Sequence, residues 1–441
     1  MAEQALATSK DNNQYDMKLN TDSLAADKYP QPSPKSANPM AGEDLVRRFV
    51  GLPLEKRRLF LDRLQQQGGD FCKLPIPAQL CGDDDIPLSL VQQGLWILHQ
   101  LDPASTAYHI AGGVSIVGAL ERAALQQAFD RLAARHDALR SVFHAVDGQP
   151  RQRLLDAAPV DIDYHDLGAL NAETAQTQAS QRAEAAARQA FDLERGPLWR
   201  VTLVRLPMQD DTPVHELNLS LHHLIADGWS LNRLLAEFAE LYAATLNRRV
   251  PQLPVLPIRH ADYAVWQRSW LEAGESQRQL AYWTDRLGGE QPVIELPFDR
   301  PRPSEPSHRG GRVGFALSEP LSHAIQQLAR QNSATVFMVL LAAFKVLLYR
   351  YSGQTDLRIG LPLANRNRPE NQHLIGYFVN TVVLRSELDS RQSFTAFLAQ
   401  IKRHLLDAQA HPDLPFEQLV DALQPERRLG QNPLFQILIN H

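Results

Sequence analysis

The sequence predicts a mixed α/β (α+β) protein of two lobes, on three observations. Residues 216–221 alternate leucines with polar side chains, as a half-buried strand does, and an amphipathic helix follows at 231–242. A second helix and strand are predicted at 336–349 and 356–362. The chain has 441 residues, more than one ordinary core, and the proline-rich stretch 297–306 lies between the two sets of elements.

The N-terminal region carries two different patterns. Residues 1–40 are polar and contain several prolines, with few apolar side chains to offset the entropy of ordering, so we predict a disordered tail. Residues 41–85 contain two apolar stripes at helical spacing, separated by Pro53 and ended at Gly68, which predict a pair of amphipathic helices and a linker. The pair either packs on the first lobe as a cap, the commoner case, or docks onto an upstream protein.

We assign residues 86–267 to the N-terminal lobe. A strand is predicted around 113–118, and a helix with one apolar side follows it. The apolar positions of this helix are Leu125, Phe129, Leu132 and Ala133. The strand at 216–221 and the helix after it complete the predicted lobe.

We assign residues 268–441 to the C-terminal lobe. The helix at 336–349 is apolar nearly all round, which predicts deep burial against a sheet. A β-branched strand at 381–385 and a helix at 394–408 close the lobe. Residues 297–306 can neither continue a helix nor donate within a central sheet, so they are expected to form a semi-rigid surface connection.

Composition argues against several classes of protein. Lys and Arg number 45 against 50 Asp and Glu, a formal net charge of −5, so no basic field is available to bind nucleic acid. The two cysteines, Cys72 and Cys81, form no CxxC or Cys/His array, which suits a reducing compartment without structural zinc. There is no run of about 18 apolar residues and no secretory type of N-terminus, so we predict a cytoplasmic location and no membrane partner.

The candidate site is the stretch His222-His223-Leu224-Ile225-Ala226-Asp227-Gly228, where the strand ends and the helix is about to begin. If the strand continues through both histidines, period two places His222 on its polar face and His223 on its leucine face. Only one imidazole can then face a given cavity, and we choose His223. Ser230 is the predicted N-cap of the helix.

This heptad matches the HHxxxDG signature of the condensation domains of nonribosomal peptide synthetases, and the chain resembles that family over roughly residues 86 to 441. Val91, Gly94 and Ala226 depart from the residues usual in the family, which affects local contacts rather than the class. Further blocks match in the expected order: 135–143 (RHExLRTxF), 262–266 (YxDYAVW), 375–381 (IGxFVNT), 411–417 (HQDxPFE) and 432–436 (the last block).

The resemblance implies two chloramphenicol-acetyltransferase-like lobes in a V-shaped pseudodimer, with the active-site tunnel between them. It implies amide formation between a donor acyl or peptidyl thioester and the amine of an acceptor aminoacyl thioester. Both substrates are carried on 4′-phosphopantetheine arms, and the domain itself binds no metal or redox cofactor.

The expected partners are the donor and acceptor carrier domains, an adjacent adenylation domain and, through the helical pair, an upstream synthetase subunit. Blocks for phosphopantetheine attachment and for adenylate formation are missing from the sequence. Because the chain begins with Met1 and stops after the last block, we interpret it as an excised, monomeric first domain.

The resemblance also suggests roles for individual residues. His223 either accepts the proton of the attacking ammonium or holds the amine, and His222, Asp227 and Gly228 complete the catalytic set. Gly228 is expected to permit a backbone conformation or approach that a Cβ would block. Asp227 is expected to hold the loop through an ion pair with Arg366. Residues assigned to the substrate channel are His136, Asn380, Trp266 and Ser230. Structural support is the more common role for the block around His136, and packing for Trp266.

Alternative functions stay open. A starter condensation domain would N-acylate the first amino acid of a lipopeptide, a secondary metabolite, from a fatty acyl-CoA or acyl-carrier donor. An ester-forming acyltransferase or an epimerisation domain would share the fold, although the matches at 135–143 and 375–381 disfavour epimerisation. A catalytically silent recruitment scaffold is a different class, and the intact His223 argues against it. A metal at the histidine pair is disfavoured because the sequence suggests no further ligands.

Overall fold

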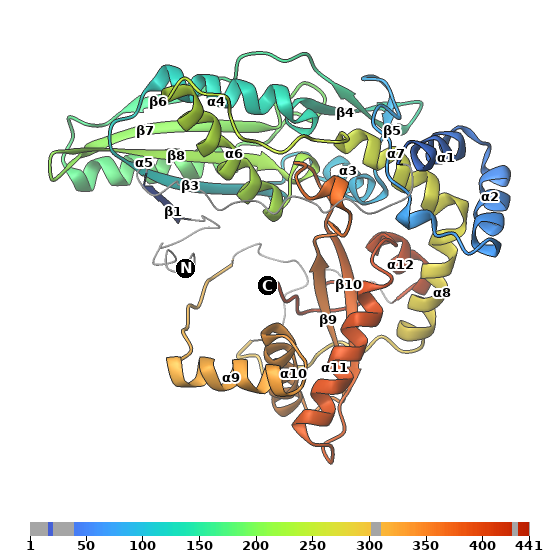
Figure 1. The fold of residues 1–441 in the computed structure, drawn as a ribbon. Helices are drawn as coiled ribbons and strands as arrows, with labels where there is room; N and C mark the ends of the chain where they lie inside the picture. The colour runs from blue at the N-terminus through green and yellow to red at the C-terminus, as the bar shows by residue number, and fades with distance from the viewer. Residues whose placement is uncertain (1–15, 21–38, 301–309, 426–430, 441) are drawn as a thin grey trace. The chain divides into compact units, whose positions relative to one another are not determined.

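The computed structural model describes residues 16–20, 39–300, 310–425 and 431–440, and the chain divides into two compact units (Figure 1). Unit 1 comprises Met1–Ala273 together with Arg366–Phe378, and unit 2 comprises Gly274–Asn365 and Val379–His441. The fold is mixed α/β, as predicted. The boundary falls at residue 273 rather than 267, because the last helix of unit 1 continues into a π-helical segment.

Unit 1 contains two sheets and the helices that cover them. Its strands are β1 (Asp16–Asn20), β2 (Ile86–Pro87), β3 (His109–Val117), β4 (Ser141–Val146), β5 (Gln149–Leu154), β6 (Ile162–Asp166), β7 (Trp199–Gln209) and β8 (Thr212–His222). Its α-helices are α1 (Pro39–Gly51), α2 (Leu54–Gln66), α3 (Leu90–Leu101), α4 (Arg122–Arg135), α5 (Ala172–Arg188), α6 (Gly228–Leu246) and α7 (His260–Trp270). Short segments of unit 1 are η1 (Phe71–Lys73), η2 (Asp137–Arg140), η3 (His223–Ile225) and η5 (Pro369–Asn371), and the π-helical η4 (Leu271–Glu275) begins in unit 1 and ends in unit 2.

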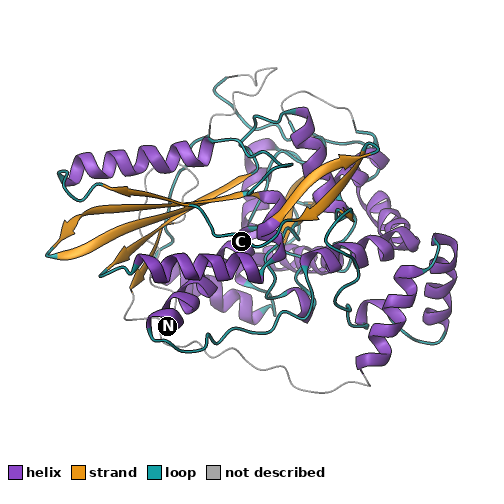
Figure 2. Ribbon diagram, turned by 90° about the horizontal axis from the view of Figure 1, so that it is seen from above, coloured by secondary structure: helices purple, strands orange, loops and turns teal. Residues whose placement is uncertain are grey.

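The main sheet has the order β1-β3-β8-β7-β6, and the smaller sheet has the order β2-β5-β4. In the main sheet β8 is antiparallel to both β3 and β7, whereas β1 and β6 pair in parallel with β3 and β7. Leu217, Leu219 and Leu221 belong to the core cluster shared with α4 and α6, as the alternation of β8 predicts. The opposite face is also covered, by α5, so Asn218 and Ser220 are buried as well. Figure 2 shows helices along both sides of these strands.

The N-terminal helices form as two short elements, and the first anchors them. α1 buries Val46 and Phe49 in a cluster with Tyr263 and Trp266 of α7, whereas none of the residues of α2 is buried. Most of the tail expected to be disordered, residues 1–15 and 21–38, lies outside the described residues. The exception differs from the prediction: β1 pairs in parallel with the free edge of β3.

Unit 2 is built on an antiparallel strand pair with helices around it, and Gly360 also forms a parallel bridge to Leu438. Its elements are α8 (Ser276–Leu287), α9 (Glu319–Gln331), α10 (Val336–Ser352), β9 (Asp356–Leu363), β10 (Asn380–Glu387), α11 (Phe394–Gln409) and α12 (Phe416–Leu423). Within the described part of the chain no single helix can span a membrane by length and apolarity, although α9 and α10, bent by 105°, pass that test together.

One expectation for unit 2 changes. α10 is not buried all round: Leu347 is 49% exposed and Tyr351 is 63% exposed, because the helix packs on its neighbours with one side only. Its buried side includes Lys345, which is completely inaccessible. Of the proline-rich connection, residues 301–309 lie outside the described residues, and Phe298 before them is 51% exposed.

Candidate active site

The two histidines lie where β8 passes into η3, before α6 begins. The backbone N–H of His222 donates to Leu198 O at 2.9 Å, and that of His223 donates to Tyr108 O at 2.8 Å. The strand ends at His222, so His223 starts a 3-10 turn and does not continue the leucine face. His222 therefore lies on the polar face of the strand as predicted, whereas the prediction that His223 continues the leucine face is wrong.

His222 is buried on the polar face of the strand. Its Nδ1 accepts a hydrogen bond from Leu224 N at 3.1 Å, which leaves the ring proton on Nε2. The ring lies 5.8 Å from each of the rings of His99 and His109. Burial, reinforced by these neighbouring imidazoles, lowers the pKa of His222 to about 3. His222 is thus neutral near pH 7, and its imidazole holds the turn that presents His223.

His223 is half-buried, and its hydrogen bond fixes its tautomer. Nδ1 lies 3.1 Å from Ala226 O, and a carbonyl oxygen can only accept, so Nδ1 carries the proton and Nε2 keeps its lone pair. Burial lowers the pKa of His223, against the opposing effects of Ala226 O and Asp227. Among the described residues Nε2 has no hydrogen-bond partner. The imidazole is therefore a neutral acceptor with one unused nitrogen.

Asp227 and Arg366, the residues of the predicted ion pair, lie together in unit 1. Nη2 of Arg366 lies 3.1 Å and 3.2 Å from the two carboxylate oxygens of Asp227, and both side chains are buried. Asp227 is also the N-cap of α6, because its Oδ1 accepts from Ser230 N at 2.8 Å. Ser230, predicted as the N-cap, instead lies inside the first turn.

Arg366 also shapes the segment that carries it. Its Nη1 donates to Asn371 O at 2.8 Å and to Leu374 O at 2.7 Å. Its guanidinium lies over the Phe378 ring, 4.2 Å from the centroid, and Phe378 N donates to Asp227 Oδ2 at 3.3 Å. Residues 366–378 are thereby fastened to the start of α6, directly after the histidine loop.

Gly376, and not Gly228, is the glycine of the site at which a side chain could not be accommodated. A Cβ on Gly228 would have nothing within 4 Å, and its φ is not left-handed, so the predicted close approach is wrong. A Cβ on Gly376 would lie 2.1 Å from Cδ2 of the buried His260. Gly376 N also donates to Ser230 Oγ at 3.1 Å.

The four residues predicted to line a substrate channel are all buried, and their contacts are structural. Ser230 is fully buried, with its hydroxyl 2.7 Å from Asp227 Oδ1 and 2.8 Å from Arg366 Nη2. Nε2 of His136 lies 2.8 Å from Glu237 Oε2. Trp266 stacks with Phe71 and Trp270. Asn380, in unit 2, donates to Pro412 O at 2.8 Å and to Leu414 O at 2.6 Å. Each of the four thus provides packing or hydrogen bonds between elements, and their place in a substrate channel stays a prediction.

Other polar side chains offer little chemistry. Neither Cys72 nor Cys81 forms a disulfide, and burial together with Asp262 raises the pKa of the Cys81 thiol to about 12. In the part of the chain that the structure describes, no three His, Cys, Asp or Glu side chains are grouped to hold a metal ion. Sequence reasoning missed Tyr377 and His260, which lie beside His223 and Gly376; their positions within or next to matched blocks were the available signal.

A family model described as "Condensation domain" matches residues 83–441, which include the histidine loop and Arg366. The chain belongs to the condensation-domain family. One of the linear gramicidin synthase proteins of Brevibacillus parabrevis is 43% identical over 353 residues, 80% of this chain and 7% of that protein. Phosphinothricin tripeptide synthetase PhsC of Streptomyces viridochromogenes is 40% identical over 396 residues, 90% of this chain and 36% of that protein. This condensation domain thus spans a minor part of the curated relatives it matches.

Solved structures agree with the family. The X-domain from teicoplanin biosynthesis has a TM-score of 0.71 and 28% sequence identity, covering 82% of this chain and 79% of that chain. The condensation domain of the monacolin K polyketide synthase MokA has a TM-score of 0.66 and 24% identity, covering 80% of each chain. These likenesses confirm the predicted fold class, and the domain is an acyltransferase of the amide-forming type found in nonribosomal peptide synthetases.

Proposed function

We propose that this domain joins a donor acyl or peptidyl thioester to the amine of an acceptor aminoacyl thioester, with Nε2 of His223 directed at the amine. The tautomer of His223 carries this proposal, because the contact of Nδ1 with Ala226 O leaves Nε2 as an acceptor. The amine nitrogen attacks the thioester carbonyl carbon, the C–N bond forms and the C–S bond breaks. The amine's proton is lost and the departing thiolate gains one.

Within this reaction, the environment of His223 favours holding the amine over removing its proton. Burial lowers the pKa of His223 from its ordinary value, so the imidazole is a weak base for an ammonium group. A neutral imidazole still accepts a hydrogen bond and aims the nitrogen lone pair of a neutral amine. Correct positioning of two reactants can lower the barrier by about 7 to 11 kcal/mol. A typical general base raises the rate ~10²–10⁴-fold, which corresponds to only about 3 to 5 kcal/mol.

The length of the curated relatives supports delivery of the substrates by carrier domains. The curated relatives are synthetases much longer than this chain, so their matching regions are parts of multidomain proteins. We propose that donor and acceptor reach His223 on phosphopantetheine arms and that a neighbouring adenylation domain supplies the acceptor. In this scheme the domain needs no cofactor of its own, and carrier domains deliver both substrates to it in the cytoplasm.

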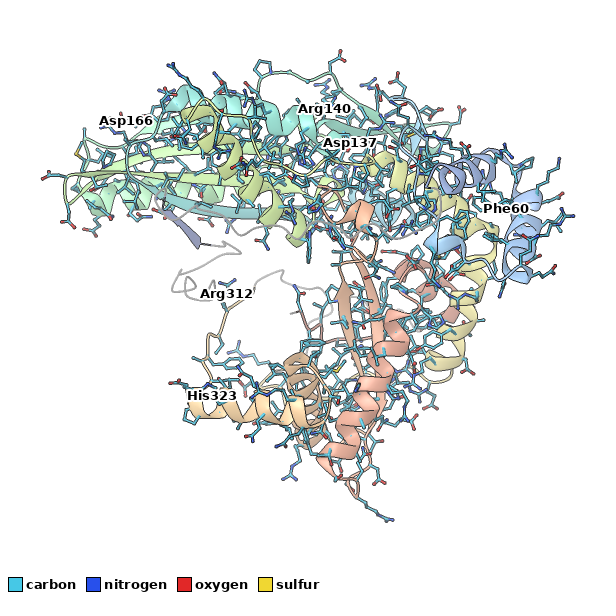
Figure 3. The ribbon with its side chains drawn as sticks, in the orientation of Figure 1. Phe60, Asp137, Arg140, Asp166, Arg312 and His323 are labelled. Atoms are coloured by element: carbon cyan, nitrogen blue, oxygen red, sulfur yellow. The ribbon has the colours of Figure 1, made fainter. Side chains whose placement is uncertain are left out.

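The test is product formation on a carrier. Wild type and the variants His223→Ala and His323→Ala are incubated with a loaded acceptor carrier and, separately, an aminoacyl-carrier or fatty acyl-CoA donor, and the carrier-bound products are weighed. His323, an exposed residue on α9 (Figure 3), is the matched control. We expect His223→Ala to lose about 10²-fold or more in rate with an unchanged melting temperature, and the control to keep full rate. Near-wild-type product from His223→Ala would remove His223 from the reaction, and the donor that yields product separates a starter domain from an elongating one.

A recruitment scaffold is the second candidate, and one comparison favours it. The X-domain of teicoplanin biosynthesis, 28% identical with a TM-score of 0.70, has been solved in a complex with OxyB. A scaffold would form no amide with any donor, whether or not His223 is present. Product that depends on His223 excludes it.

A further inference from the structure

Tyr377 is the aromatic neighbour of the His223 imidazole. The two rings meet edge to face, with centroids 5.8 Å apart and an interplanar angle of 67°. Both residues are half-buried. Edge-to-face contact is a favoured arrangement of aromatic rings, so the pair is a specific contact and not a chance approach.

The backbone of Tyr377 is fixed on both sides. Its own carbonyl oxygen lies 3.2 Å from Nε2 of the buried His260. Gly376 before it fits against the His260 ring so closely that no Cβ could be added. Phe378 after it is buried, packs on the same ring at 4.9 Å and donates its N–H to Asp227. The base of the Tyr377 side chain therefore has little freedom to move away from His223.

The imidazole, by contrast, has a soft torsion of its own. The ring torsion of a histidine is broad and roughly two-fold, so a single hydrogen bond from Nδ1 to Ala226 O does not by itself exclude a flipped ring. A flip would place Cδ2 where Nδ1 now lies and Cε1 where Nε2 now lies, so the bond to Ala226 O would be lost and Nε2 would turn away from its present direction. A second contact with the imidazole ring restricts that movement, and Tyr377 provides it.

We propose that Tyr377 is a positioning residue whose ring holds the His223 imidazole with Nε2 available to the acceptor amine. The inference rests on the proposed amide formation. Tyr377 acts through His223, and the part that acts is the aromatic ring. Its effect is therefore on the rate of condensation once substrates are bound, more than on their binding.

The experiment compares Tyr377→Phe, Tyr377→Leu and Tyr377→Met with a matched control, Tyr351→Leu, at an exposed tyrosine of α10. Measurements on the full chain are kcat and KM for amide formation, melting temperature, and the ¹⁵N signals of the histidine side chains. The sequence has 15 histidines, and the His223 signals are identified as those lost in His223→Gln. The Met variant is used if the Leu variant does not fold.

We expect Tyr377→Phe to stay within about twofold of wild-type kcat, and Tyr377→Leu to lose tenfold or more in kcat with little change in KM. In the Leu variant the ¹⁵N signals of His223 should shift from the Nδ1-protonated tautomer toward a mixture. Wild-type kcat and unchanged His223 signals in a folded Leu or Met variant would overturn the proposal, as would a Phe variant as slow as the Leu variant, since the hydroxyl would then be responsible. If wild type forms no amide with any donor, the proposed function fails while the tautomer measurement still tests Tyr377.

Discussion

Arg366 donates to both carboxylate oxygens of Asp227, at 3.1 and 3.2 Å, although 139 residues separate the two in the sequence. Asp227 is at the same time the N-cap of α6, four residues after His223. The ion pair thus connects the end of the histidine loop to residues 366–378, which carry Tyr377. A change at Arg366 would reach the loop through this pair and through Phe378, whose N–H also donates to Asp227.

Asp227→Asn should therefore be costly even though asparagine can still cap α6. We expect it to lower the free energy of unfolding by about 3–5 kcal/mol, because it leaves a buried guanidinium without its counter-charge. Urea denaturation measures the change, with Arg249→Met, at the solvent-exposed pair with Glu240, as a control that should lower stability far less. The double variant Asp227→Asn/Arg366→Met should be less destabilised than the sum of the single variants, and strict additivity would show that the two residues do not interact.

Two glycines of the site should respond differently to alanine. Gly376→Ala places a Cβ against the His260 ring and should destabilise the protein by about 1–3 kcal/mol while lowering activity. Gly228→Ala has open space at the start of α6, and alanine favours helix, so stability should be equal or slightly higher. Melting temperatures and condensation rates of both variants check this, and a tolerated Gly376→Ala would contradict the close approach to His260.

The anchoring of α1 predicts which N-terminal residues matter. Phe49 is fully buried, with its ring 4.3 Å from that of Phe71, so Phe49→Ala should cost about 3–5 kcal/mol of unfolding free energy. Leu59 on α2 is 58% exposed, and Leu59→Ala should cost less than about 0.5 kcal/mol. Chemical denaturation separates the two. Unchanged stability of Phe49→Ala, combined with slower transfer from an upstream carrier, would instead support docking by the helical pair.

Lys345 should make stability depend on pH. Its ammonium donates to Leu357 O, Leu384 O and Ser386 Oγ inside unit 2, and burial lowers its pKa from 10.5 to about 7. Below pH 7 the lysine is charged in both states and the burial penalty is complete. Between pH 7 and 10.5 the unfolded chain binds the extra proton, so stability rises with pH by up to about 1.4 kcal/mol per unit.

The measurement is the free energy of unfolding from pH 7 to pH 10 for wild type, Lys345→Met and Lys56→Met, an exposed lysine on α2. Subtracting the Lys345→Met curve removes the contributions of other groups, and the difference should rise with pH. Lys56→Met should run parallel to wild type. A flat difference for Lys345→Met would mean that the buried amine keeps one protonation state throughout.

The sequence predicted the helices and strands around the site well, because their signals are local. The leucine alternation of β8 and the spacing in α6 identified both elements, and Asp227 and Arg366 were paired through the family motif. The errors concern distances between elements that are remote in the chain. Whether β8 ends at His222 depends on its neighbours Leu198 and Tyr108, and whether Gly376 is essential depends on His260. An apolar run likewise does not reveal which side of α10 is covered.

The assignment of residues 366–378 to unit 1 has a consequence for engineering. The chain leaves unit 1 at residue 273, returns at residue 366 and leaves again after residue 378, so unit 1 is not encoded by one continuous stretch of gene. A hybrid synthetase recombined at residue 273 would receive its histidine loop from one parent and its Arg366 and Tyr377 from the other. With crossover points outside residues 83–441, the histidine loop, Arg366 and Tyr377 all come from the same parent. When a crossover lies within that range, residues 366–378 should be taken from the parent that supplies the histidine loop.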